Sequence, residues 1–228
     1  YYCNDCYLEQ IKEFIHSDNI QLKPLADKPN NSVELWINNR IFGYNHDLLP
    51  KPLDYNVFYV NFFNIVLEKL QFKGVTIKNL EYRPPDLLDL YDKLDNKYKD
   101  IQILILNSQP LSNQYDYKKK QWDNYITNLN KLFKICTTTK IKNINCTMDD
   151  KLTIKNIAAL SIKVPVIIAI NSGVVPGLLN KYTLANVKRF YTFDTRCYYS
   201  YLNFVSKNKI TDISVNELQT VINNGINQ

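Results

Sequence analysis

Two nearly continuous apolar segments constrain the fold of this chain more than any other feature of its sequence. Residues 101–106 read IQILIL, and residues 164–170 read VPVIIAI. A strand with one face in water alternates apolar and polar residues, whereas these segments are apolar on both faces, as in a parallel strand that helices cover on both sides. The sequence therefore predicts a parallel β-sheet buried between layers of helices.

Shorter patterns predict the other elements of this sheet. Further strands are expected near 134–138, 141–147 and 187–193. Helices are expected over 119–133, from Asp150 or Thr153 onward, and over 214–223. Strands that alternate with helices at this spacing form βαβ units, whose strands are parallel. We therefore expect residues 100–228 to form a Rossmann-like α/β domain, with helices on both faces of one sheet.

Residues 1–99 show a weaker version of the same pattern. Helices are predicted over 7–16, after Asn56 and over 87–94, and strands over 33–37 and 75–82, with a long loop at 43–55. These elements amount to part of an α/β domain. We expect a smaller, partial α/β region at 1–99 in front of the domain at 100–228.

The charge of the chain raises the question of a nucleic-acid partner. The net charge is +6, from 28 Lys and Arg against 22 Asp and Glu. The lysines are spread along the chain, and the densest run, Lys118–Lys120, opens a predicted helix as a solvated face. A nucleic-acid binder clusters its basic residues, so nucleic acid is not the expected partner. The abundance of Asn, Lys, Ile and Tyr is typical of an AT-rich genome.

Cysteine and histidine usage bears on metals and on the compartment. The sequence has five cysteines and two histidines, with a single CxxC at Cys3 and Cys6. A structural zinc site needs a second ligand pair, and an odd number of cysteines argues against a complete disulfide framework. We expect reduced thiols, no metal, no membrane span and a cytoplasmic protein. Because the chain begins at Tyr1 rather than methionine, we expect a processed or partial form of a longer polypeptide.

Two polar loops follow buried strands at the ends where open parallel sheets bind ligands. Asn107, Ser108 and Gln109 follow the first apolar segment, and Asn171, Ser172 and Gly173 follow the second. Gly173 permits close approach of a ligand to the backbone. Free N–H groups at the start of the next helix bind anions. The alternative is a plain turn in which Ser172 caps that helix.

These segments resemble the C-terminal half of GT-B glycosyltransferases, and the heptosyltransferase-like group in particular. The resemblance covers about residues 100–195 and rests on short stretches, namely the strand with Asn107–Gln109, Cys136–Thr139, Leu152–Ser161 and the turn at 167–173. It implies that Ser108, Ser172 and Gly173 face the diphosphate of a nucleotide sugar. It also implies that Thr138 and Thr139 lie towards the base or ribose.

The resemblance implies transfer of a sugar from a nucleotide-sugar donor to a hydroxyl acceptor, with no bound cofactor or metal. The base for the acceptor hydroxyl is then expected to be His46 or Asp47, because a carboxylate can orient an imidazole and raise its basicity. A surface histidine in a polar loop is the alternative. A non-catalytic binding or structural module of the same fold, part of a larger polypeptide, is the competing function. The sugar, the acceptor and the oligomeric state stay open.

Overall fold

The computed structural model describes residues 2–13, 18, 20–31, 55–78, 87–110, 115–193 and 210–212 of the chain. The described residues fall into two compact units, of which the first ends at residue 78 and the second begins at residue 87. Some predicted features lie outside the described residues: the strand at 33–37, His46 and Asp47, and the helix at 214–223.

The first unit begins with a short parallel β-pair. Strand β1 (Tyr2–Cys3) pairs with β2 (Lys23–Pro24). Helix α1 (Asp5–Lys12) lies between these strands in the chain, and the 3₁₀ turn η1 (Leu25–Asp27) follows β2. The helix predicted over 7–16 therefore starts at Asp5, where an acidic side chain in the first turn interacts favourably with the helix dipole.

Helix α2 (Tyr55–Lys69) is followed by a turn that leads into the range 75–82, where a strand was predicted. Residues 75–78, the described part of that range, are not in a strand. The Asn64 side chain explains the difference: its Oδ1 accepts the N–H of Ile77 at 2.7 Å, and its Nδ2 donates to the carbonyl of Ile77 at 2.9 Å. The backbone groups that a neighbouring strand would pair are thus bound to the helix.

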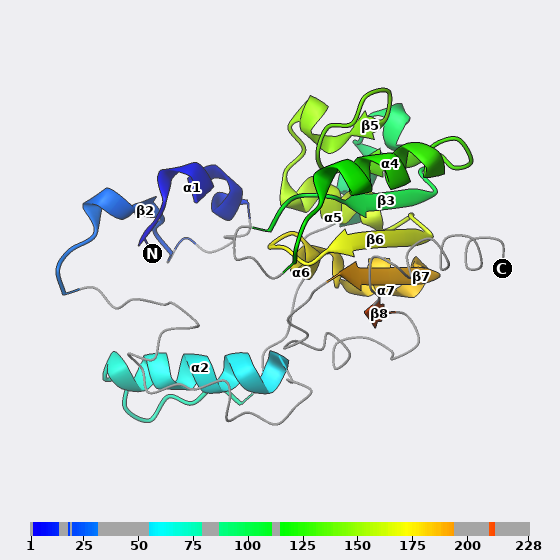
Figure 1. The fold of residues 1–228 in the computed structure, drawn as a ribbon. Helices are drawn as coiled ribbons and strands as arrows, with labels where there is room; N and C mark the ends of the chain where they lie inside the picture. The colour runs from blue at the N-terminus through cyan, green and yellow to red at the C-terminus, as the bar shows by residue number, and fades with distance from the viewer. Residues whose placement is uncertain are drawn as a thin grey trace. The chain divides into compact units, whose positions relative to one another are not determined.

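The second unit contains a parallel sheet of six strands among the described residues (Figure 1), in the order β5-β4-β3-β6-β7-β8. The strands are β3 (Ile103–Leu106), β4 (Ile135–Thr137), β5 (Asn145–Cys146), β6 (Val166–Ile170), β7 (Arg189–Phe193) and β8 (Ile210–Asp212). Every neighbouring pair is parallel. The predicted parallel sheet of an α/β fold is confirmed, whereas β8 was not predicted.

The chain leaves the middle of this sheet in two opposite directions. From β3 it proceeds outward to β4 and β5, and it then returns to β6, on the other side of β3, before continuing to β7 and β8. Strands β3 and β6 are therefore neighbours, with Leu106 paired to Ala169, and the connections that follow them diverge. In open parallel sheets, this switch point is where a crevice for a ligand forms.

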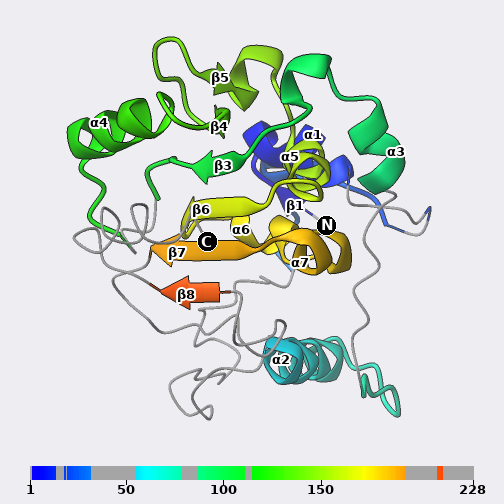
Figure 2. The ribbon, with the colours of Figure 1, turned by 90° about the vertical axis from the view of Figure 1, so that its right-hand side faces the viewer.

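Helices cover both faces of the sheet, as Figures 1 and 2 show. Helix α4 (Lys119–Leu129) lies on one face, while α5 (Ile154–Ser161), α6 (Val175–Leu178) and α7 (Lys181–Asn186) lie on the other. Helix α3 (Leu87–Asp92) packs against α5, and the 3₁₀ turn η4 (Asn96–Tyr98) leads from α3 to β3. No described helix is long and apolar enough to cross a membrane.

The core explains why the strand segments are apolar throughout. On the α4 face, Ile103, Ile105 and Ile168 belong to one cluster with Trp122 and Ile126. Because successive strand residues point to opposite faces, the residues between them face α5, α6 and α7. These second-face residues are also fully buried, and they include Leu104, Ile167, Ala169 and Phe190.

Helix α5 starts at a capping box. Thr153 Oγ1 accepts the N–H of Asn156 at 3.3 Å, and Asn156 Oδ1 accepts the N–H of Thr153 at 3.2 Å. Of the two caps considered from the sequence, Thr153 is therefore the one present. Asp150 instead accepts hydrogen bonds from Lys97 and Tyr98.

Candidate functional site

The carboxyl ends of β3, β4 and β6 lie side by side at one edge of the sheet, because these strands are parallel neighbours. The loops that follow them contain every predicted donor-binding residue, namely Asn107, Ser108, Gln109, Thr138, Thr139, Asn171, Ser172 and Gly173. The structure therefore brings these residues to one edge. It does not describe His46 and Asp47, the predicted base.

Asn107 joins the loop after β3 to the loop after β4. Its Oδ1 accepts the N–H groups of Thr138 at 3.1 Å and Thr139 at 2.8 Å, and its Nδ2 donates to the Thr139 carbonyl at 3.3 Å. In return, Thr139 Oγ1 donates to the Asn107 carbonyl at 3.0 Å, and the Asn107 N–H donates to Thr138 Oγ1 at 3.1 Å. We call this set of bonds the Asn107 clamp.

The clamp occupies polar groups of Thr138 and Thr139, the residues that the resemblance assigns to the base or ribose. Asn107 and Thr138 are 1% and 6% exposed, and the Thr138 N–H also donates to the Ile105 carbonyl at 3.0 Å. Ser108 is half-buried, and its hydroxyl lies 3.3 Å from Thr138 Oγ1. The loop after β4 is thus held as a support, and Ser108 and Gln109 are the more open residues of this side.

In the turn after β6, by contrast, fewer of the backbone N–H groups are engaged in hydrogen bonds. The N–H of Asn171 donates to the Phe193 carbonyl at 3.0 Å, and that of Val175 to the Ser172 carbonyl at 3.1 Å. Between them, the N–H groups of Ser172, Gly173 and Val174 have no acceptor among the described residues. Gly173 is exposed, and a Cβ atom built on it meets no atom within 4 Å. Gly173 therefore stands in open space within a run of three amides that have no acceptor among the described residues.

Two features of the same turn bear on the sequence-based expectations. Helix α6, which begins there, has only four residues, so its dipole is weaker than that of a longer helix. The Ser172 hydroxyl is buried and has no hydrogen-bond partner among the described residues, so the alternative in which it caps α6 is not observed. The backbone amides, rather than the dipole or the hydroxyl, are the donors that this turn presents.

An aromatic cluster that the sequence did not reveal packs on the α4 side of this edge. The rings of Tyr115 and Trp122 stand edge-on to Phe193, with centroids 5.9 and 4.9 Å away, and Trp122 Nε1 donates to the Tyr115 hydroxyl at 3.2 Å. Tyr117, beside Trp122, hydrogen-bonds to the Thr139 side chain, and burial raises the pKa of its hydroxyl to about 12. These contacts join residues too far apart in sequence for a local pattern to show.

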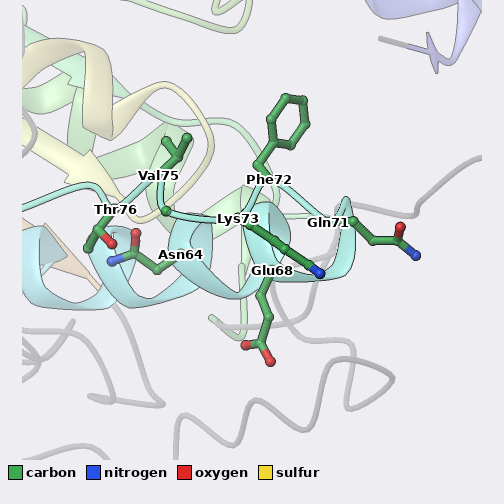
Figure 3. Close-up of a pocket in the computed structure, with 8 residues that line it drawn as sticks. Asn64, Glu68, Gln71, Phe72, Lys73, Val75 and Thr76 are labelled. Atoms are coloured by element: carbon green, nitrogen blue, oxygen red, sulfur yellow. The ribbon is translucent and has the colours of Figure 1, made fainter.

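The first unit holds a cavity of about 440 Å³ beside the end of α2 (Figure 3). It is lined by Asn64, Glu68 and the turn from Gln71 to Thr76. Its charged side chains do not converge, because Glu68 and Lys73 point in different directions from the backbone (Figure 3). A ligand site needs convergent polar groups, so the carboxyl edge of the sheet is the better candidate.

The described residues contain no group of three His, Cys, Asp or Glu side chains that could hold a metal ion. Among them, Cys3, Cys136 and Cys146 are buried free thiols. Burial is the main cause that raises the pKa of Cys136, to about 12, so this thiol is protonated and unreactive at neutral pH. Comparisons of the chain with protein-family models, curated proteins and solved structures found no match.

Proposed function

We propose that residues 100–228 form a Rossmann-like domain that binds a nucleotide sugar at the carboxyl edge of the sheet. Numbered along the chain from β3 to β8, the strands stand in the order 3-2-1-4-5-6. This is the order of doubly wound nucleotide-binding folds, whose ligands bind at the switch point between the first and fourth strands. Here that point lies between β3 and β6.

The observation that carries the proposal is the run of three amides at Ser172–Val174, which have no acceptor among the described residues. Successive backbone N–H groups form a concave seat for anions such as phosphate. The pairing of Leu106 with Ala169 brings the loop with Ser108 beside this turn. The diphosphate binds at the amides, and the nucleoside extends over the supported loop after β4.

The proposed activity is glycosyl transfer of the GT-B type. The acceptor oxygen bonds to the anomeric carbon, its proton passes to His46 or Asp47, and the bond from that carbon to the diphosphate oxygen breaks. The free amides stabilise the negative charge that develops on the leaving diphosphate. Donor binding needs no divalent metal in this mechanism.

Gly173→Ala and Gly173→Val test the site without disturbing the fold. Gly173 does not have a positive φ, and the added side chain meets open space, so the stability should stay the same or rise slightly. The new side chain adds bulk in the middle of the amide run and should exclude a diphosphate. As a control, Gly177→Ala places its Cβ 3.1 Å from Ile154, inside the protein, and should leave ligand binding intact.

The measurement is the thermal unfolding of each variant with UDP, ADP, their sugar conjugates and an oligonucleotide, in the presence of EDTA. A ligand at 100 times its dissociation constant adds about 2.7 kcal/mol to the stability of the wild type. Equal shifts in the wild type and both Gly173 variants would place the ligand elsewhere. A shift with the oligonucleotide alone would replace the proposal by nucleic-acid binding.

Catalysis is tested separately from binding. The double variant with His46→Ala and Asp47→Ala should abolish sugar transfer while leaving donor affinity unchanged, because the base acts on the acceptor. A wild type that binds nucleotide sugars but transfers no sugar to any hydroxyl acceptor is a binding module of the same fold.

A further inference from the structure

The Asn107 side chain hydrogen-bonds to the backbone of a different loop, the one that follows β4. All of its hydrogen-bonding partners lie on the neighbouring loop, about 30 residues further along the chain, at Thr138 and Thr139. It sits one residue after β3, directly before Ser108, at the switch point of the sheet. The amide therefore couples the ends of two strands at the place where the proposed ligand binds.

We propose that Asn107 is a positioning residue, which holds the β3 and β4 loops together so that Ser108 and Gln109 face the amides of Ser172–Val174. This inference rests on the proposed function. It changes the role that the sequence indicated for Asn107, because its amide contacts protein and not ligand. The neighbouring N–H groups of Ser108 and Gln109 have no acceptor among the described residues, and they are the donors that this loop would offer to the ligand.

The geometry of the clamp explains why an asparagine is required. One atom must accept the two N–H groups of Thr138 and Thr139, and the other must donate to the Thr139 carbonyl. Only a side-chain amide offers an acceptor and a donor at this spacing. Aspartate keeps the acceptor but places a second oxygen against that carbonyl, and leucine keeps the volume but offers neither.

The test compares Asn107→Leu and Asn107→Asp with a control that loses a buried hydrogen bond elsewhere. Thr183→Val removes a fully buried hydroxyl that bonds to Ser161 and Asn180 in the helical layer opposite α4. Ser161 ends α5 just before β6 begins, so its bond to Thr183 lies near the amino end of β6, whereas the proposed site is at the carboxyl end. The control reports what destabilisation alone does to ligand binding.

The dissociation constant for UDP and for ADP is measured by calorimetry at a temperature where circular dichroism shows each variant folded. Asn107→Leu should weaken binding on the order of tenfold, since misplaced contact groups lose their alignment with the ligand. The dissociation constant of Asn107→Asp should lie between those of Asn107→Leu and the wild type. If Asn107→Leu does not fold, Asn107→Asp alone tests the positioning role. Thr183→Val should bind as the wild type does, although it melts earlier.

Two different failures can be told apart. If the wild type binds neither nucleotide, the proposed function is wrong and the positioning role falls with it. If the wild type binds and both Asn107 variants bind equally well, only the positioning role is overturned. Equal weakening by the Asn107 variants and Thr183→Val would mean that the clamp contributes stability alone.

Discussion

The Tyr98 hydroxyl lies 2.6 Å from Asp150 Oδ2 and 3.1 Å from the carbonyl oxygen of Cys146. Tyr98 precedes the first strand of the sheet and is 1% exposed, whereas Cys146 ends the outermost strand β5. The phenol thus attaches the segment before β3 to the short edge strand. Lys97 Nζ also contacts Asp150 Oδ2, at 2.5 Å, so one carboxylate oxygen receives both groups.

Tyr98→Phe should lower the free energy of unfolding by about 1–2 kcal/mol, because the substitution removes a buried hydroxyl that hydrogen-bonds to Asp150 and to the Cys146 carbonyl. Urea unfolding measures the change. Tyr182→Phe is the matched control, since the Tyr182 hydroxyl has no hydrogen-bond partner among the described residues, and its loss should be nearly neutral. Equal effects of the two substitutions would contradict the role given to the Tyr98 hydroxyl.

The hydrogen bonds from Lys97 and then Tyr98 lower the pKa of Asp150 below its usual value of 3.8. A carboxyl group whose pKa is lower in the folded state stabilises the protein above its unfolded pKa, and this contribution is lost as the pH falls through the folded pKa. Asp150→Asn should therefore destabilise the protein at pH 7 and have a smaller effect below about pH 4. Urea unfolding of both proteins across this range checks the prediction, which a constant difference would refute.

Ser161 and Thr183 form a buried pair whose hydroxyl oxygens are 2.6 Å apart, and Asn180 Nδ2 donates to Thr183 Oγ1 at 3.0 Å. Thr183→Val should cost about 1–3 kcal/mol, because it leaves polar partners unsatisfied in the core. The double variant with Thr183→Val and Ser161→Ala should cost less than the sum of the two single changes, since each single change already removes the hydrogen bond between the two hydroxyls. A double-mutant cycle by urea unfolding measures the coupling, and strict additivity would contradict the pair.

Thr153→Ala should destabilise the protein by about 1 kcal/mol, through loss of the side-chain half of the capping box at the start of α5. Thr153→Ser keeps the hydroxyl and should stay within a few tenths of a kcal/mol of the wild type. Thermal unfolding of the two variants gives the comparison. A loss of stability as large in Thr153→Ser as in Thr153→Ala would show that the cap is not the cause.

Local sequence patterns predicted the parts of the fold whose cause is local. Residues 103–106 and 166–170 are apolar at every position and must be buried on both faces. Strands β3 and β6 therefore follow from this local pattern alone. The start of α5 near residues 150–153 follows in the same way, although the sequence left Asp150 and Thr153 open as its cap. The positions of Ser108 and Ser172 at strand ends were also predicted locally, because each lies in a polar stretch directly after an apolar segment.

Only the tertiary structure decided which groups at those strand ends are open to a ligand. Asn107 looks like a ligand contact in the sequence, yet its amide bonds to Thr138 and Thr139 once β3 and β4 pair. Residues 75–78 are not in the strand expected over 75–82, because the Asn64 side chain hydrogen-bonds to the backbone of Ile77. A polar group bonds to whichever partner folding brings near, and that partner is not encoded by its neighbours in the chain.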